Sequence, residues 1–196
     1  SVSLSGKVSG TLAELRGRDI DISFGELTRI LCDFDISGLP DINNSFIYLG
    51  VSRLRTNAAD IGDIEINGKK KINVPDFFHT LGTVSFDGSF TGFLSDFVAY
   101  GNLRSESGAL STDVSVRPGE KNSFRLKGLV RGSSISLGSL LDNPEMFGNL
   151  AMRADIDGYA SPEARFSGSI TGRIDSIELN SYLYRNVSLN GRFSEK

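Results

Sequence analysis

The sequence is poor in the residue types on which many enzymes and secreted domains depend. Its 196 residues include no Trp, one Cys, one His and two Met. The single cysteine, Cys32, excludes an intrachain disulfide, and it leaves an oxidising compartment compatible with the chain. No segment approaches the roughly 18 consecutive apolar residues of a membrane-spanning helix. The N-terminus also lacks the basic and apolar regions of a signal peptide. Because the first residues already lie inside a repeated pattern and residues 190–193 follow a hairpin-like signal, we expect a piece of a longer protein whose targeting signals lie elsewhere.

The net charge and the amino-acid composition indicate which partners and which fold class to expect. A net charge of −3 gives no electrostatic case for a nucleic-acid partner, and 39% hydrophobic residues suffice for an apolar face or core. Glycine is abundant, with 22 residues, and this abundance is typical of many turns and bent strands. Helix-forming stretches are few, so the composition favours a mainly β protein.

One twelve-residue pattern occurs three times, with glycines at its third and seventh positions between apolar residues. The copies read LSGKVSGTLAEL at residues 4–15, FDGSFTGFLSDF at 86–97 and FSGSITGRIDSI at 166–177. Their first glycines, Gly6, Gly88 and Gly168, lie 82 and 80 residues apart. This near-constant period indicates an array of repeats. We expect units at 1–82 and 83–163 and the start of a third at 164–196.

Each copy places its apolar residues and both glycines on one face of a strand, because residues two apart share a face. Glycine within a strand costs roughly 0.5–1 kcal/mol relative to Ala. Two glycines on the apolar face therefore indicate either a sharp bend of the sheet or a close approach to its backbone.

Short strands are expected along most of the chain, mainly in antiparallel pairs, and Asn67-Gly68 and Pro118-Gly119 mark turns. Strand-like alternation covers residues 2–15, 18–24, 30–37, 46–54, 62–67, 70–74, 83–101, 109–117, 122–131, 149–157, 164–178 and 182–195. Pro75 and Gly82 bracket a short helix over 76–81, and single helical turns are expected at 56–61 and 137–142. No helix is long enough to cover a sheet. The apolar face must close on itself or hold an apolar ligand, and the spare room beside the glycines suits an acyl chain.

The sequence resembles the periplasmic TamB/AsmA-like (DUF490-type) proteins, in their Bacteroidetes-like form. The motifs that carry this resemblance are VSFDGSFTG at 84–92, LGSLLDN at 137–143 with GNL at 148–150, the stretch 34–61 that begins FDISGLPD, and IELNSYLYRNVSLNG at 177–191. Together they extend over most of the chain.

The resemblance implies a repeat-built, strongly curved and mostly antiparallel sheet with a taco-like or bridge-like apolar groove. It also implies a non-enzymatic segment of a periplasm-spanning lipid-transfer bridge or outer-membrane assembly factor, from a parent protein anchored in the inner membrane. The expected partners are phospholipid and an outer-membrane assembly protein, with no cofactor.

On this interpretation, apolar residues of the three motif copies line the groove and their glycines let the sheet curve. The groove candidates are Leu4, Val8, Leu12, Phe86, Phe90, Leu94, Phe166, Ile170 and Ile174. The curvature glycines are Gly6, Gly10, Gly88, Gly92, Gly168 and Gly172. The same pattern leaves open which of the apolar residues pack as core.

Two other classes stay open. One is a closed β-sandwich-like structural or interaction module without lipid. The other, a polysaccharide-active β-solenoid, needs clustered carboxylates and a period of about 20–30 residues, which the sequence lacks. No catalytic or metal-binding residue is assigned. His79 has no acidic or Cys partner nearby in the sequence, and Asp155-Ile156-Asp157-Gly158 lacks the later ligands of a calcium loop.

Overall fold

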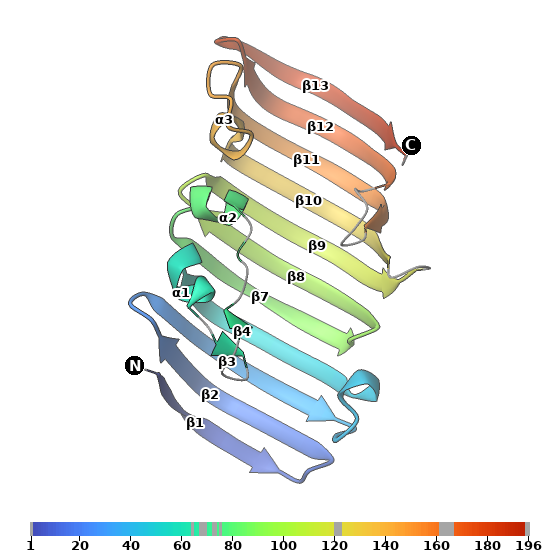
Figure 1. Cartoon of the computed structure of the whole chain (residues 1–196). Coiled ribbons are helices and arrows are strands. Elements are labelled where there is room, and N and C mark those ends of the chain that lie inside the picture. The colour runs from blue at the N-terminus through green and yellow to red at the C-terminus, as the bar shows by residue number, and fades with distance from the viewer. Residues whose placement is uncertain are drawn as a thin grey trace.

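The computed structural model describes residues 2–63, 65–66, 70–71, 74, 76–119, 123–160 and 167–194. Within them, eleven strands form one antiparallel sheet in which each strand pairs with the next along the chain (Figure 1). In order these are β1 (Ser3–Gly10), β2 (Glu14–Phe24), β3 (Thr28–Ser37), β4 (Phe46–Thr56), β7 (Val84–Phe93), β8 (Asp96–Ser105), β9 (Gly108–Pro118), β10 (Phe124–Ser136), β11 (Phe147–Ala160), β12 (Ser167–Leu179) and β13 (Tyr182–Phe193). The mainly β, antiparallel prediction is confirmed.

The remaining elements are short. A 3-10 turn, η1, spans Ile42–Asn44, and the β4–β7 connection contains α1 (Ala58–Gly62), β5 (Glu65–Ile66), β6 (Lys70–Lys71) and α2 (Asp76–Thr80). The last helix, α3 (Leu137–Leu140), joins β10 to β11. All three predicted helical segments are thus present. The strands β5 and β6 pair as predicted around Asn67-Gly68, although these two residues lie outside the described part of the chain.

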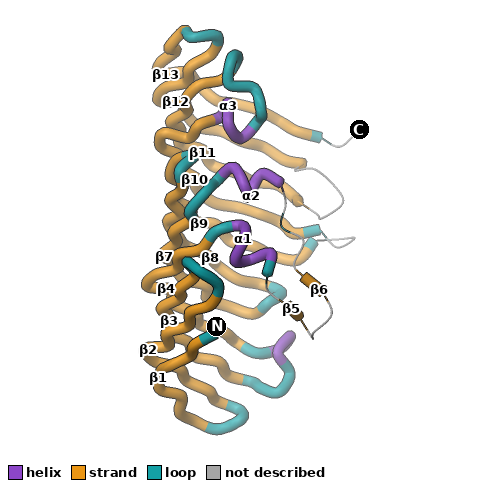
Figure 2. The backbone as a smooth tube through the Cα atoms, turned by 60° about the vertical axis from the view of Figure 1, so that its left-hand side comes forward, coloured by secondary structure: helices purple, strands orange, loops and turns teal. Residues whose placement is uncertain are grey.

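The helices lie along one edge of the large sheet, on the same side of it (Figure 2). We call this the helix edge, and it also carries the hairpin turns at residues 25–27, 106–107 and 180–181. The opposite, far edge carries the turns at 11–13, 38–45 and 94–95. The sheet is open, with β1 at one end and β13 at the other. The closed sandwich is therefore not the arrangement of the described residues.

Two predicted strands are each divided by a turn. Residues 11–13 separate β1 from β2, and Leu94 and Ser95 separate β7 from β8. The second motif glycine enters both turns with a positive φ, +116° at Gly10 and +138° at Gly92. A Cβ on Gly10 would lie 2.0 Å from the carbonyl oxygen of Glu14, so only glycine allows this entry to the turn.

The three motif copies occupy β1, β7 and β12, which are four and five strand positions apart. Because neighbouring strands are antiparallel, the first two copies run from the helix edge to the far edge and the third runs the opposite way. The sheet continues through the predicted boundary at 82/83 in the β4–β7 ladder. The boundary at 163/164 lies outside the described residues.

Direct cross-strand pairing places most apolar residues of the eleven strands on one face, whereas Tyr48, Val98, Tyr100 and Leu129 lie on the other. In one row across the sheet, for example, Phe34, Leu49 and Phe90 pair in sequence from β3 to β7. We call this the apolar face and the opposite one the polar face. Register shifts interrupt the ladders of β1–β2, β2–β3, β3–β4, β4–β7, β10–β11 and β11–β12 without moving apolar residues off this face.

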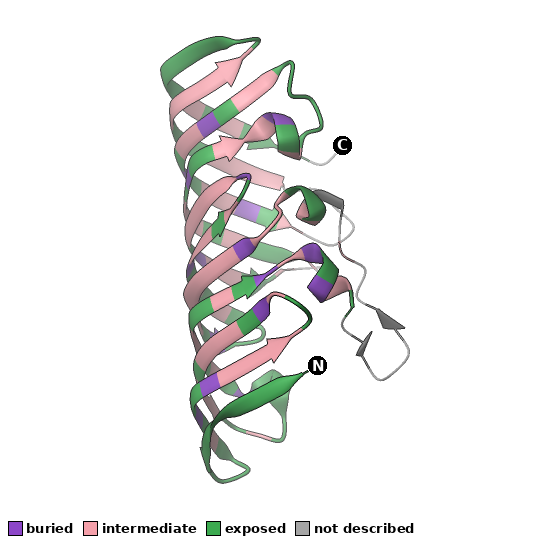
Figure 3. Ribbon diagram, turned by 90° about the vertical axis from the view of Figure 1, so that its left-hand side faces the viewer, coloured by how far each residue is buried: buried purple, intermediate pink, exposed green. Residues whose placement is uncertain are grey.

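Some of the buried residues lie where the helices meet the apolar face, and others, such as Ile20 and Ala154, lie along the strands (Figure 3). Beneath α1, Thr28, Thr56 and Val84 are at most 3% exposed, and Leu150 beside α3 is 8% exposed. The chain exposes 13070 Å² of surface, whereas a compact protein of its 21.2 kDa mass exposes about 9,000 Å². A single sheet with one face largely open to solvent accounts for the excess.

Candidate apolar binding face

The apolar face has a central row of residues with one row on either side of it. The central row is Ile20, Cys32, Val51, Gly88, Gly101, Thr112, Val130, Ala154, Gly172 and Leu189. The row on the helix-edge side is Leu4, Ile22, Ile30, Leu54, Phe86, Leu103, Leu110, Gly132, Met152, Ile174 and Val187. The row on the far-edge side is Val8, Gly17, Phe34, Leu49, Phe90, Ala99, Val114, Gly128, Ile156, Ile170 and Gly191. The central row and the row on the far-edge side each hold four Gly or Ala residues, whereas the row on the helix-edge side holds Gly132 alone.

Six of the nine groove candidates lie on these rows: Leu4, Val8, Phe86, Phe90, Ile170 and Ile174. Leu12 and Leu94 lie in far-edge turns and are 74% and 44% exposed. Phe166 lies outside the described residues. The motif thus identified parts of the apolar face, whereas most of its members come from strands without the motif.

The motif glycines touch the neighbouring strand. A Cβ on Gly172 would lie 2.1 Å from the carbonyl oxygen of Arg153, and one on Gly88 would lie 2.3 Å from that of Tyr100. Gly168 is similarly close to Asp157, and Gly6 to Ile20. The sequence analysis offered two reasons for these glycines, a sharp bend of the sheet or a close approach to the backbone. The contacts show a close approach, and the approaching group is the adjacent strand.

Large side chains fill the space over several glycines. The ring of Phe86 lies over Gly88 and Gly101, where an added Cβ would come within 2.7 Å and 2.3 Å of the ring. Phe34 covers Gly17 in the same way, and Ile135 covers Gly132. Phe90 packs on Phe97 with ring centroids 4.5 Å apart. The apolar face is thus partly self-packed, which explains why most of its side chains are half-buried.

The cysteine lies on this face. Cys32 is half-buried in the central row between Ile20 and Val51, and burial raises the pKa of its thiol. No sequence signal placed Cys32 there, because its position follows from the register of β3 against β2 and β4.

The polar face is held by short ion pairs between strands. Arg29 binds Asp21 through two nitrogens at 3.0 and 2.6 Å, and its guanidinium lowers the pKa of that carboxyl. Arg125 lowers the pKa of Asp157 by the same kind of hydrogen bond. Asp155 and Asp157 both lie in β11, paired with β10 and β12, so they form part of the polar face.

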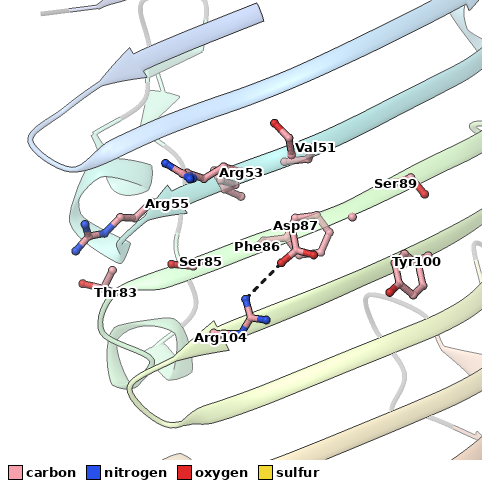
Figure 4. Close-up of a pocket in the computed structure, with 13 residues that line it drawn as sticks. Val51, Arg53, Arg55, Thr83, Ser85, Phe86, Asp87, Ser89, Tyr100 and Arg104 are labelled. Carbon is pink, nitrogen blue, oxygen red and sulfur yellow. Dashed lines mark hydrogen bonds and ion pairs between the residues drawn. The ribbon is translucent and has the colours of Figure 1, made fainter. Parts of the chain in front are cut away.

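An open depression of about 850 Å³ occupies the polar face over β4, β7 and β8 (Figure 4). Arg53, Arg55 and Arg104 surround it, and Arg104 forms a 3.5 Å ion pair with Asp87. It is polar and lies on the opposite side of the sheet from the groove candidates.

The described part of the chain contains no cluster of side chains that could bind a metal ion. No three His, Cys, Asp or Glu residues there come close enough to hold a metal ion. His79 is exposed in α2. Likewise, no helix among the described residues has the length and apolarity needed to cross a membrane.

No protein-family model, curated protein or solved structure matches this chain.

Proposed function

We propose that the apolar face holds phospholipid acyl chains, and that the chain is a non-enzymatic segment of a periplasmic lipid-transfer bridge or outer-membrane assembly factor. One observation carries this proposal. The apolar face crosses all eleven strands without interruption, and within the described residues only the short helices at one edge cover it. The periplasmic location and the role in lipid transfer or outer-membrane assembly are proposed from the resemblance of the sequence to TamB/AsmA-like proteins.

Three features support a concave apolar face, hence a groove. Small residues are frequent in the central row and in the row on its far-edge side, as the inside of a bend requires. Register shifts occur in six of the ten ladders of the large sheet, and bulges bend strands. Residues within strands also have positive φ angles, including Asp19 at 53° and Ser134 at 51°.

A groove of this kind can bind lipid without polar contacts. Each methylene transferred from water to an apolar wall contributes about 0.8 kcal/mol. Eleven strands spaced about 4.8 Å apart make the face roughly 48 Å long, which exceeds one extended acyl chain. The face therefore provides length and apolar surface, the two properties that a conduit for lipid tails needs.

The test combines native mass spectrometry of detergent-free protein with uptake of a fluorescent phospholipid. The variant pair Phe90→Asp and Ile170→Asp puts carboxylates on the apolar face. The matched control, Thr91→Asp and Asn190→Asp, puts two carboxylates on the polar face instead, at positions directly opposite uncharged residues. We expect bound phospholipid in the wild type and control, and its loss in the apolar-face variant with circular dichroism unchanged.

Two results would contradict the proposal. One is a folded, monodisperse wild-type protein that carries no phospholipid and takes up none. The other is equal lipid binding by the apolar-face variant and the control, which would place the lipid elsewhere on the molecule.

A further inference from the structure

The charges of the polar face are sorted into lengthwise zones. The two rows nearest the helix edge, followed from β2 to β13, carry eight arginines and three aspartates, a net charge of +5 on a chain whose total is −3. We call these rows the arginine band. Its arginines are Arg29, Arg53, Arg55, Arg104, Arg131, Arg153, Arg173 and Arg185, and its aspartates are Asp21, Asp87 and Asp175.

Three of these arginines stand directly opposite one another on adjacent strands. Arg131 of β10 pairs with Arg153 of β11, which pairs with Arg173 of β12. Like charges in directly opposed positions destabilise a sheet. Asp175 is the one carboxylate within reach of this ladder among the described residues, 3.5 Å from Arg153 and 3.8 Å from Arg173. The ladder therefore keeps an excess of positive charge.

The band is continuous along the sheet. Arg53 and Arg55 of β4 line the 850 Å³ depression together with Arg104 of β8 (Figure 4). Arg104 also lines a second depression, of about 400 Å³, together with Arg131 and Arg153. The two hollows thus meet at Arg104. Hydroxyl and amide groups of Ser85, Ser111 and Asn102 lie between the arginines and offer further donors.

The next row of the polar face, toward the far edge, has a negative net charge. From β3 to β13 it carries Asp33, Asp113 and Asp155 and no basic residue. Alternate residues of a strand are about 7 Å apart, so the acidic row borders the band closely. A ligand that spreads across the face meets repulsion there, whereas a single extended chain that follows the band does not.

We propose that the arginine band binds an extended acidic peptide segment of a partner protein, laid across the strands. Carboxylates are matched by the planar guanidinium fork. A flat anionic membrane or a duplex nucleic acid would overlap the acidic row. Single-stranded nucleic acid requires aromatic stacking platforms, and on the described band and its depressions the exposed aromatic is Tyr100 alone. The site is separate from the apolar face, so lipid and peptide can be bound together.

The probe is fluorescein-labelled poly-L-glutamate of about 20 residues, with affinity measured by fluorescence anisotropy at low and physiological salt. The band variant combines Arg131→Gln, Arg153→Gln and Arg173→Gln. The matched control combines Arg16→Gln, Arg117→Gln and Arg125→Gln, which removes the same charge from the far-edge half of the polar face. We expect the band variant to bind at least about tenfold more weakly and the control to change less than about twofold.

The fold of each variant is checked by its thermal midpoint, which should not fall in the band variant because it relieves repulsion between like charges. The proposal is overturned if both triple variants lose affinity equally, since net charge alone would then explain binding. It is also overturned if the wild type ignores poly-L-glutamate at low salt, or prefers an oligothymidylate or phosphatidylglycerol vesicles to it.

Discussion

Asp60 joins α1 to the β2–β3 hairpin through Thr28. Its carboxylate accepts hydrogen bonds of 2.7 Å from both the backbone N–H and the hydroxyl of Thr28. The N–H groups of Glu26 and Leu27 donate to it as well, at 3.0 and 2.9 Å. Gly25 must remain glycine here, because its φ is +66° and a Cβ would lie 2.3 Å from the carboxylate. The insertion that carries α1 is thus fastened to the hairpin whose strand β3 pairs with β4.

The first prediction concerns this carboxylate. Asp60→Asn keeps one acceptor oxygen but turns an NH₂ group toward backbone donors, and the site is only 5% exposed. We expect the free energy of unfolding to fall by about 2–3 kcal/mol, measured by urea denaturation. Asp142→Asn, an exposed aspartate at the end of the α3 turn with φ 52°, is the control and should change it by less than about 0.5 kcal/mol. Equal effects would contradict the role given to Asp60.

The second prediction is a pH dependence with a definite sign. Backbone hydrogen bonds lower the pKa of Asp60 from 3.8 to about 2 in the folded chain. Its contribution to stability is therefore fully present above about pH 4 and is lost as the pH falls through 2. The difference in unfolding free energy between wild type and Asp60→Asn should be constant from pH 5 to 7 and narrow below pH 4. A constant difference down to pH 2.5 would show that ionisation of Asp60 is not involved.

Sequence patterns predicted the mainly β class and the three short helical segments because these depend on local signals. Two-residue alternation, Pro before a helix and Gly after it are all readable along the chain. The turn at Leu94 and Ser95 was missed because the alternation of Phe86 and Phe90 with the motif glycines runs on to Leu94, without Pro or an Asn-Gly pair. Only the backbone angle at Gly92 distinguishes this turn from a continuing strand.

The arginine band could not be predicted from local patterns. Arg131, Arg153 and Arg173 are about 20 residues apart in the sequence and meet only through the registers of β10, β11 and β12. The position of Cys32 in the central row likewise depends on the register of β3 against β2 and β4. The three motif copies are almost equally spaced in the sequence, but they are four and then five strands apart in the sheet. The first interval contains the long β4–β7 connection, whereas the second contains the shorter β10–β11 connection and so has room for one more strand.

The third prediction tests the glycine contacts. In Gly172→Ala the new Cβ would lie 2.1 Å from the carbonyl oxygen of Arg153, and a backbone atom cannot move away without disturbing the ladder. We expect a loss of about 2 kcal/mol in unfolding free energy. Gly62→Ala at the end of α1 is the control, because its Cβ would meet only Val74 at 3.7 Å. A tolerated Gly172→Ala would contradict the close approach of β11 and β12.

The last prediction uses Cys32 as a reporter of what occupies the apolar face. Because burial raises the pKa of its thiol, labelling by a maleimide should be slow at pH 7 and accelerate with rising pH. Bound phospholipid covers the central row in the proposed complex, so stripping lipid should speed labelling and adding it back should slow labelling again. The control carries Cys32→Ser with Thr91→Cys on the polar face, where labelling should not respond to lipid. Lipid that left Cys32 accessible would show that acyl chains do not lie along the central row.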